Sequence, residues 1–179
     1  MSFVNFLNDL QKFSPKLVEN IKSIYLESNN IISETNNYDF GAGILLICPK
    51  TKKILLGLRS DNQEDSGVWC GFGGKGEIGE TPIQAAMREV WEEAKIHPKD
   101  YNVITPALHI NKNTDSFKFH NYLGITDSEI QPKINDEHKA SKWFSMPELS
   151  NIPLHFGLKK ILSNNDKTTI INNYVDGNM

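Results

Sequence analysis

Three glutamates gather in one short segment that directly follows four glycines within residues 71–76; they are Glu89, Glu92 and Glu93. On a helix that turns by about 100° per residue, their side chains fall within about 100° of one another. Glu89 and Glu93 form an i,i+4 pair of like charge, which destabilises a helix. A divalent cation bound by the carboxylate oxygens would turn this repulsion into a favourable interaction. The pattern therefore indicates a cation site, and the alternative is a solvated acidic face with the neighbouring Arg88 as salt-bridge partner.

The glycine-rich segment itself indicates a ligand-binding loop. Gly71, Gly73, Gly74 and Gly76 allow the backbone to approach a ligand closely. Lys75 stands where a phosphate could be bound, in the segment that leads to the N-terminus of a helix. A glycine-rich turn with a solvated lysine is the alternative for the loop alone. The loop and the helix together indicate a ligand-binding site more specifically than either does alone.

The helix that carries the glutamates has clear limits. Thr81 can cap a helix, and proline, here Pro82, is favoured at the first helical position. We expect an end near His97, because the residue before Pro98 is biased away from helical angles. The apolar residues span an arc of about 140° and form a core face beside the glutamates. They are Ile83, Ala86, Met87, Val90, Trp91 and Ala94.

Short apolar runs separated by turn signals predict strands on both sides of this helix. The predicted strands are residues 40–49, 52–60, 101–110, 116–125 and 141–144, of which the first four form two pairs. Further helices are predicted at residues 146–150 and 156–163, and two short helices between residues 3 and 26. The Asn-rich residues after Ser163 are expected to be loosely ordered. This pattern predicts a mixed α/β domain with helices packed on a sheet.

The chain of 179 residues is long enough for one domain with a real core. A net charge of −3 and the lack of a basic block argue against binding to a nucleic-acid polymer or a membrane surface. Cys48 and Cys70 lack zinc-ligand spacing and are interpreted as buried, reduced thiols of a cytoplasmic protein. We expect neither a signal peptide nor a membrane span.

The glycine-rich segment and the helix together resemble the Nudix box. Gly74 is followed six positions later by Glu80, and then by "REVWEEAKI" from Arg88 to Ile96. This sequence departs from the pattern at one position, because Lys95 stands where the Nudix box has a glycine at the end of the helix. The resemblance implies an α/β fold, namely a Nudix α/β/α sandwich with a mixed sheet and an N-terminal helical extension. The expected divisions are residues 1–37 for the extension, 38–165 for the Nudix domain and 166–179 for a C-terminal tail.

The resemblance also implies a metal-dependent active site. Mg²⁺ or Mn²⁺ would be held by the Gly73 carbonyl and by Glu89, Glu92 and Glu93, while Glu80 and Arg88 position these ligands. The bound metal would neutralise a pyrophosphate and activate a water that attacks phosphorus. Glu137 resembles the additional carboxylate that such proteins supply from an opposite loop as metal ligand or general base; solvation is its alternative. His138, next to it, is a weaker candidate.

Five residues are candidates for substrate binding, each with a structural alternative. Arg59 resembles a phosphate-contacting arginine, and Lys75 could meet a phosphate. Trp69 and Phe72 could stack on a base, although buried aromatic residues more often belong to a core. His155 could line the pocket.

The implied function is cleavage of a (deoxy)nucleoside triphosphate, such as dGTP or 8-oxo-dGTP. "VWCGFGGK" is similar to the stretch before the box in MutT-like enzymes. A nucleotide-sugar or ADP-ribose pyrophosphatase is the first alternative. A Nudix module that binds a nucleotide without cleaving it is the second. The N-terminal helices would cover the domain or form a homodimer interface.

Overall fold

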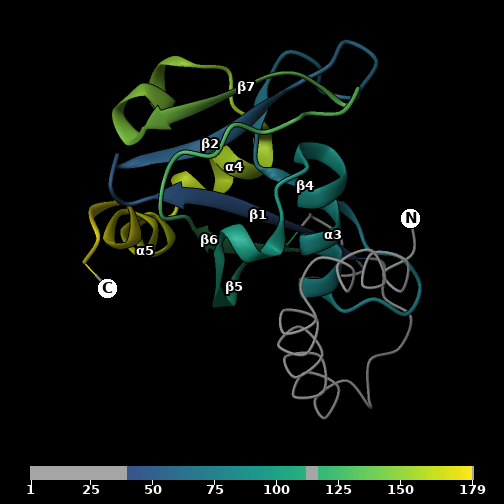
Figure 1. Cartoon of the computed structure of the whole chain (residues 1–179), viewed down its shortest axis with the longest axis horizontal. Coiled ribbons are helices and arrows are strands. Elements are labelled where there is room, and N and C mark those ends of the chain that lie inside the picture. Colours follow the sequence, from purple (N-terminus) through teal and green to yellow (C-terminus); the bar gives the residue numbers. More distant parts are fainter. Residues whose placement is uncertain (1–39, 112–116, 179) are drawn as a thin grey trace.

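The computed structural model describes residues 40–111 and 117–178, which form a seven-stranded mixed sheet with helices (Figure 1). The strands are β1 (Phe40–Cys48), β2 (Lys53–Arg59), β3 (Trp69–Cys70), β4 (Phe72–Lys75), β5 (Asn102–Asn111), β6 (Lys118–Ile125) and β7 (His138–Ser145). The helices are α3 (Pro82–Ala94), α4 (Phe156–Leu162) and α5 (Asn165–Asp176), with 3₁₀ turns η1 (Pro98–Asp100) and η2 (Met146–Asn151).

The sheet follows the order β3-β2-β1-β6-β5, with β4 paired to β1 and β7 paired to β2. β1 and β6 run parallel, and the other pairs run antiparallel. The mixed sheet and the two predicted strand pairs are therefore confirmed. β7 is longer than the predicted residues 141–144, and β3 and β4 were not predicted.

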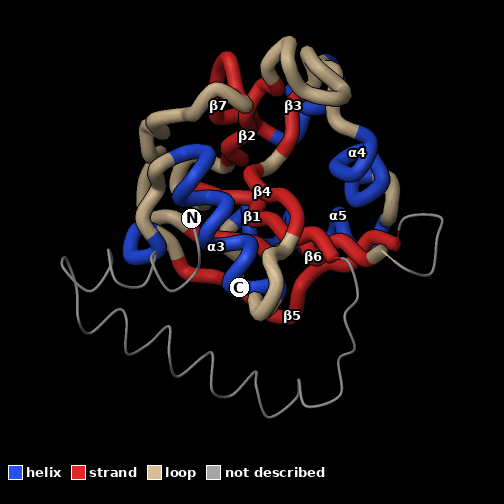
Figure 2. The backbone as a smooth tube through the Cα atoms, turned by 90° about the vertical axis from the view of Figure 1, so that its right-hand side faces the viewer, coloured by secondary structure: helices blue, strands red, loops and turns tan. Residues whose placement is uncertain are grey.

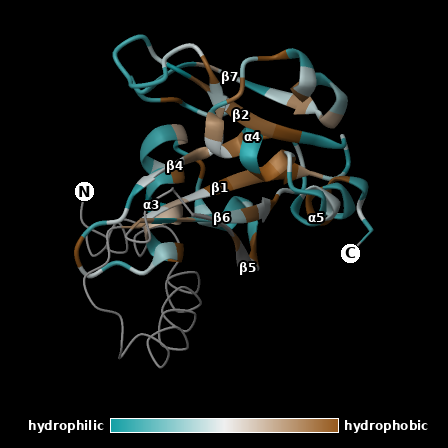
Figure 3. Cartoon of the chain, turned by 180° about the vertical axis from the view of Figure 1, so that it is seen from behind, coloured by the Kyte–Doolittle hydropathy of each residue, from teal (hydrophilic) through white to brown (hydrophobic). Residues whose placement is uncertain are grey.

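Helices cover both faces of the sheet, α3 on one face and α4 with α5 on the other (Figure 2). β1 shows why, because successive side chains of a strand point to opposite faces. Ile44 and Leu46 pack in the core cluster of α3, whereas Leu45 and Ile47 pack in the cluster of α4 and α5. β1 is accordingly apolar along much of its length (Figure 3). The predicted α/β/α layering is confirmed.

The helix α3 begins where the sequence predicts. Thr81 Oγ1 accepts from the Gln84 amide at 3.4 Å, and Gln84 Oε1 accepts from the Thr81 amide at 2.8 Å, so the two residues form a capping box. The helix ends at Ala94, earlier than predicted, because Lys95 adopts the left-handed conformation with φ 53°. The Lys95 amide donates to the Trp91 carbonyl at 3.0 Å, which closes the last turn.

We expect Lys95→Gly to raise the free energy of unfolding by about 0.5 kcal/mol. A left-handed residue other than glycine costs roughly 1–2 kcal/mol, which the glycine variant recovers. The variant also loses a contact of Lys95 Nζ with the Trp91 ring, 5.5 Å from its centroid, and an exposed contact of this kind contributes about 0.5–1 kcal/mol. Lys95→Ala is the matched control, since it loses the same contact and keeps the strained Cβ. Urea denaturation would contradict the account if the two variants were equally stable.

The glycine-rich segment, predicted as a loop, forms the strand β4. Gly73 lies opposite Gly43 in β1, and a Cβ on Gly73 would be 2.4 Å from the Gly43 Cα. A Cβ on Gly43 would be 2.6 Å from the Phe72 carbonyl oxygen. These glycines therefore allow two backbones to approach each other, a requirement that sequence composition does not distinguish from approach to a ligand.

The C-terminal residues are more ordered than the sequence suggests. The residues after Ser163 form α5, whose Ile171 and Val175 are buried in the second core cluster. The two helices predicted between residues 3 and 26 lie outside the described residues, so the N-terminal extension and the division at residue 37 remain predictions.

Two simpler expectations concern the cysteines and the membrane. Cys48 and Cys70 are both buried free thiols, as predicted. Within residues 40–111 and 117–178, none of the helices has the length and apolar character needed to cross a membrane.

Candidate active site

Arg88 is the centre of a buried ion-pair cluster on α3. Its Nε and Nη2 donate to the two carboxylate oxygens of Glu80 at 2.8 and 3.0 Å. Its Nη1 donates to Glu89 Oε1 and to Glu92 Oε2, both at 2.9 Å, and Nη2 also reaches the Lys75 carbonyl oxygen at 3.2 Å. Only 3% of Arg88 is exposed. One guanidinium thus binds three carboxylates and ties the helix to the end of β4.

Glu89 lies directly against the glycine-rich strand. A Cβ on Gly74 would be 2.7 Å from Glu89 Oε1, so glycine is what leaves room for this carboxylate. Burial raises the pKa of the Glu89 carboxyl to about 7, although the charge of Arg88 acts in the opposite direction. The charges of Glu93 and Glu92 raise this pKa further. The cluster therefore holds more negative charge than Arg88 compensates.

Glu93 is the most buried of the three glutamates, with 4% exposed. Its Oε2 accepts from the Gly73 amide at 3.1 Å and lies 3.1 Å from His138 Nε2. Burial raises the pKa of the Glu93 carboxyl, and the hydrogen bond with His138 lowers it. The sequence suggested His138 only weakly, because nothing in its local pattern shows that it reaches a residue 45 positions away.

The segment before β7 brings Glu137 to the same place. It is anchored to the last turn of α3, because the Lys133 and Asn135 amides donate to the carbonyls of Ala94 and Glu93 at 2.8 and 2.9 Å. Glu137 directly precedes His138, whose Nε2 lies 3.1 Å from Glu93 Oε2, and the charge of Glu137 contributes to the raised pKa of Glu93. Glu137 is thus brought beside the helix.

The donor set suits a divalent cation in chemistry and in charge. It consists of hard carboxylate oxygens, which Mg²⁺ and Mn²⁺ prefer. Two of the carboxylates, Glu89 and Glu93, are buried with raised pKa values, and a nearby cation would favour their ionised forms. Among the described residues, no three acidic, histidine or cysteine side chains converge closely enough to hold an ion as they stand.

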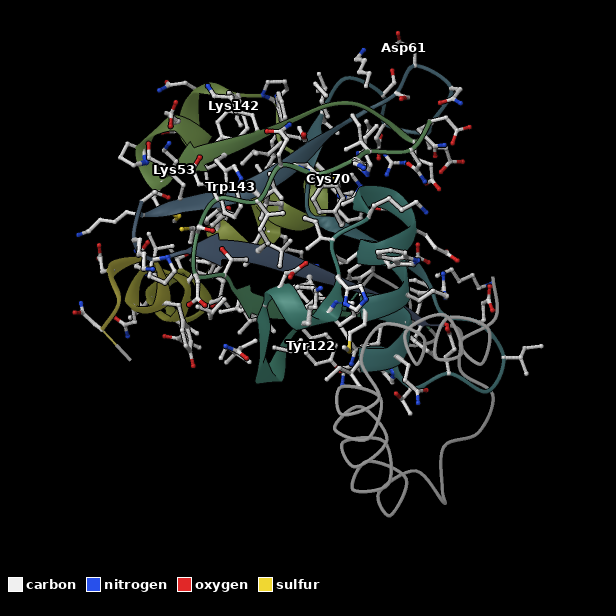
Figure 4. All side chains as sticks on the ribbon, in the orientation of Figure 1. Lys53, Asp61, Cys70, Tyr122, Lys142 and Trp143 are labelled. Carbon is white, nitrogen blue, oxygen red and sulfur yellow. The ribbon has the colours of Figure 1, made fainter. Side chains whose placement is uncertain are left out.

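A cavity of about 290 Å³ lies along β4, at its junction with β1 and α4. Five of the predicted residues line it, namely Arg59, Phe72, Gly73, Lys75 and His155. Cys70 also lines it, and burial raises the pKa of its thiol to about 12, so this cysteine is a poor nucleophile. Cys70 is labelled at the centre of the molecule in Figure 4.

The two aromatic residues predicted to stack on a base are placed in the cores. Trp69 packs edge-on against Phe144 with ring centroids 4.7 Å apart and is not among the residues that line the cavity. Phe72 borders the cavity but is fully buried, and its ring meets His138 at 5.1 Å in the cluster of α3. The aromatic residues around the cavity are instead Phe117, Phe119 and Phe156, which the sequence analysis missed. Phe156 is 50% exposed, and its place next to the predicted His155 is the only signal in the sequence that could have indicated it.

The connection between β2 and β3 closes one side of the cavity. Arg59 Nε donates to the Glu64 carbonyl at 2.8 Å, and His155 Nε2 lies 3.6 Å from Asp65 Oδ2. Glu64 and Asp65 both line the cavity. Asp61, on the same connection, lies at the outer edge of the molecule (Figure 4) and forms an ion pair with Lys139.

Comparisons with known proteins agree with this arrangement. Residues 37–164 match the family model of the NUDIX domain. A curated relative, the nucleoside triphosphate pyrophosphatase/Nudix hydrolase fusion protein of Bifidobacterium longum, is 29% identical over 127 residues, which are 66% of this chain and 26% of that protein. The chain thus corresponds to about a quarter of the length of that relative.

Two solved structures are similar in fold. A Nudix hydrolase from M. smegmatis, RenU, has a TM-score of 0.62 at 20% identity over 74% of this chain and 85% of that chain. An Ap4A hydrolase from C. elegans has a TM-score of 0.60 at 19% identity over 73% of this chain and 98% of that chain. Since the domain model spans most of the sequence, the chain belongs to the Nudix family.

Proposed function

We propose that this chain is a divalent-cation-dependent pyrophosphohydrolase that cleaves a (deoxy)nucleoside triphosphate, with guanine as its base. The observation that carries the proposal is the position of β4. Its glycines contact Glu89 and Glu93 with their backbone, and the same strand lines the cavity. Glu89, Glu92, Glu93 and Glu137 do not line the cavity, so the site has two parts that β4 connects. In this proposal the phosphate chain extends from the cavity along β4 toward the glutamates of α3.

Each part of the site has a stated task in this proposal. Arg59 and Lys75, both lining the cavity, bind the phosphates, and Phe119 and Phe156 pack against the base. Glu89, Glu92 and Glu93, with the Gly73 carbonyl, are the residues that would hold Mg²⁺ or Mn²⁺. When bound, the ion neutralises the phosphates and lowers the pKa of water. Glu80 and Arg88 keep the glutamates in place.

A carboxylate beside the reacting phosphorus would take the proton of the attacking water. Glu93 and Glu137 are the two candidates, because both lie at the junction of α3 and the segment before β7. General bases of this kind contribute typically 10²–10⁴-fold to a rate. We assign the proton to Glu137 and the fixed ligand role to Glu93, since Glu93 is held by two hydrogen-bonding partners.

Guanine is favoured by the acceptors that line the cavity. Asn121 Nδ2 donates to the Leu108 carbonyl at 3.2 Å, which leaves its carbonyl oxygen as an acceptor. The carboxylates of Glu64 and Asp65 add further acceptors. Guanine presents two adjacent donors on one edge, N1–H and the exocyclic amino group, which a single carboxylate can accept together, whereas adenine and cytosine present an amino donor beside a ring acceptor. The two buried free thiols are in keeping with a cytoplasmic protein.

The test is the release of products from a panel of nucleotides, with Mg²⁺ or with EDTA. The panel holds dGTP, 8-oxo-dGTP, the other dNTPs, ADP-ribose, GDP-mannose and a dinucleoside polyphosphate. The proposal predicts Mg²⁺-dependent cleavage with the highest kcat/KM for a guanine triphosphate. A preference for ADP-ribose or GDP-mannose would contradict a nucleoside triphosphate as substrate and identify a nucleotide-sugar or ADP-ribose pyrophosphatase instead. Tight nucleotide binding without cleavage of any member of the panel would contradict hydrolysis and identify a module that binds a nucleotide without cleaving it.

We expect Arg59→Ala to raise KM more than it lowers kcat. A phosphate contact already made in the ground state contributes to binding of the substrate and of the transition state alike, so its loss appears mainly in KM. Steady-state kinetics on the preferred triphosphate would measure this, with Lys142→Ala as control because Lys142 is exposed on β7 (Figure 4) and does not line the cavity. A fall in kcat alone would remove Arg59 from ground-state binding.

A further inference from the structure

His138 is buried between the sheet and α3, with 2% of its side chain exposed. It is the first residue of β7 and lies opposite Arg59 of β2, next to a shift in register between Leu58 and Arg59. Its ring meets Phe72 edge-on at 5.1 Å. The position is therefore fixed by the strand pairing and by packing.

A gap at Gly57 makes room for this ring. A Cβ on Gly57 would lie 2.5 Å from His138 Nδ1 and 2.8 Å from Cε1. Contacts this short do not occur in folded proteins, so any larger residue at position 57 would displace the imidazole. The absence of a side chain at position 57 thus leaves the space that the His138 ring occupies.

The hydrogen-bonding pattern identifies the tautomer of His138. Nε2 lies 3.1 Å from Glu93 Oε2, whereas Nδ1 is buried without a hydrogen-bond partner among the residues that the structure describes. Nδ1 lacks a partner in either tautomer, as an N–H donor or as an acceptor, and therefore does not distinguish them. Oε2 decides, because it already accepts from the Gly73 amide and a carboxylate oxygen is an acceptor, so Nε2 carries a proton and His138 donates to Glu93.

Both partners of Glu93 use the same carboxylate oxygen. The Gly73 amide, from β4, and His138 Nε2, from β7, both meet Oε2 at 3.1 Å. Two donors from different strands fix the rotation of the carboxylate, and Oε1 is the oxygen left for a further partner. Groups that orient a ligand in this way determine how well a site binds its ion.

We propose that His138 is a positioning residue, which fixes the Glu93 carboxylate through Oε2 and reserves Oε1 for the divalent cation. This inference rests on the proposed function, because it takes Glu93 as a ligand of the cation. Gly57 is required for the same arrangement, because a side chain at this position would overlap the His138 ring.

The experiment measures Mn²⁺ affinity by electron paramagnetic resonance, without nucleotide. His138→Leu removes the donor and should weaken Mn²⁺ binding by roughly 10- to 100-fold. His138→Gln keeps an N–H donor and should restore most of that loss. Gly57→Ala leaves every polar group in place, displaces the ring and should weaken binding as well. Tyr101→Phe is the matched control, because it also removes a buried polar group of the α3 cluster and should leave the affinity unchanged.

A second measurement uses the wild-type protein and requires no variant to fold. Long-range ¹H–¹⁵N spectra of the metal-free protein should show the His138 ring with its proton on Nε2. A proton on Nδ1, or wild-type Mn²⁺ affinity in both His138→Leu and Gly57→Ala, would overturn the proposal. If the wild type cleaves no nucleotide, the proposed function fails, and the affinity and tautomer results still decide the role of His138.

Discussion

Glu93→Gln should reduce kcat by on the order of 10² or more, because loss of a fixed charge that stabilises a transition state typically costs this much. The amide keeps the size of the side chain and one oxygen acceptor, so the Gly73 contact can persist. The fold should also persist. Burial raises the pKa of Glu93, so the ionised form is less favourable in the folded than in the unfolded chain, and stability falls as pH rises through the folded pKa. Removal of the charge should therefore not lower the free energy of unfolding at pH 8.

The kinetic measurement is the Mg²⁺-dependent turnover of the preferred triphosphate, and thermal unfolding is followed in parallel. Glu129→Gln is the matched control, since Glu129 is paired with Lys53 on the surface and should have wild-type kcat. Wild-type turnover in Glu93→Gln would remove Glu93 from the active site. Lower turnover with a lower unfolding temperature would show a structural effect instead.

Arg88→Ala should lower the free energy of unfolding by about 3–5 kcal/mol, the usual cost of removing one partner from a buried ionic cluster. The variant leaves Glu80, Glu89 and Glu92 close together without their shared cation, and Glu80 and Glu89 are largely buried. We expect added Mg²⁺ to recover part of this loss, because a ligand that binds the folded state stabilises it. Urea denaturation with EDTA and with Mg²⁺ measures both effects.

Lys52→Ala provides the comparison for this loss. Lys52 forms an ion pair with Asp176 at 3.1 Å, but both side chains are well exposed. Exposed pairs contribute typically 0.2–1 kcal/mol, so this variant should remain near wild-type stability. Equal losses in Arg88→Ala and Lys52→Ala would contradict the description of Arg88 as the centre of a buried cluster.

The helix α3 could be predicted well because the sequence features that indicate it are local. The cap at Thr81, the apolar arc and the spacing of Glu89, Glu92 and Glu93 all depend on residues within one helix. The pairing of Arg88 with Glu92 follows from the same periodicity. The end of the helix was predicted less well, because the sequence predicts an end near His97, whereas the left-handed Lys95 ends the helix at Ala94.

The parts that failed depend on strand pairing. β4 consists largely of glycine and resembles a loop until Gly43 in β1 is known to lie opposite it. Without that strand, the direction of the Phe72 side chain could not be assigned, so stacking on a base and packing in the core, its stated alternative, could not be distinguished. The contact of His138 with Glu93 requires the register of β2 with β7, which no local pattern contains.

The C-terminal helix was missed for a different reason. Its Asn-rich composition has a low intrinsic helix propensity. Ile171 and Val175, four residues apart, nevertheless bury their side chains against the sheet. Tertiary packing therefore overrides a weak local preference, as it does for most short helices.

The most direct test of the central claim is to identify the products of hydrolysis in H₂¹⁸O by mass spectrometry. We expect that, with Mg²⁺, a guanine nucleoside triphosphate yields a nucleoside monophosphate and pyrophosphate, one of which carries a single ¹⁸O on phosphorus. The reaction should stop with EDTA and be strongly reduced in Glu93→Gln. Products that form equally with EDTA, or triphosphates that remain intact with Mg²⁺ across all bases, would contradict the assignment of this site as a pyrophosphohydrolase.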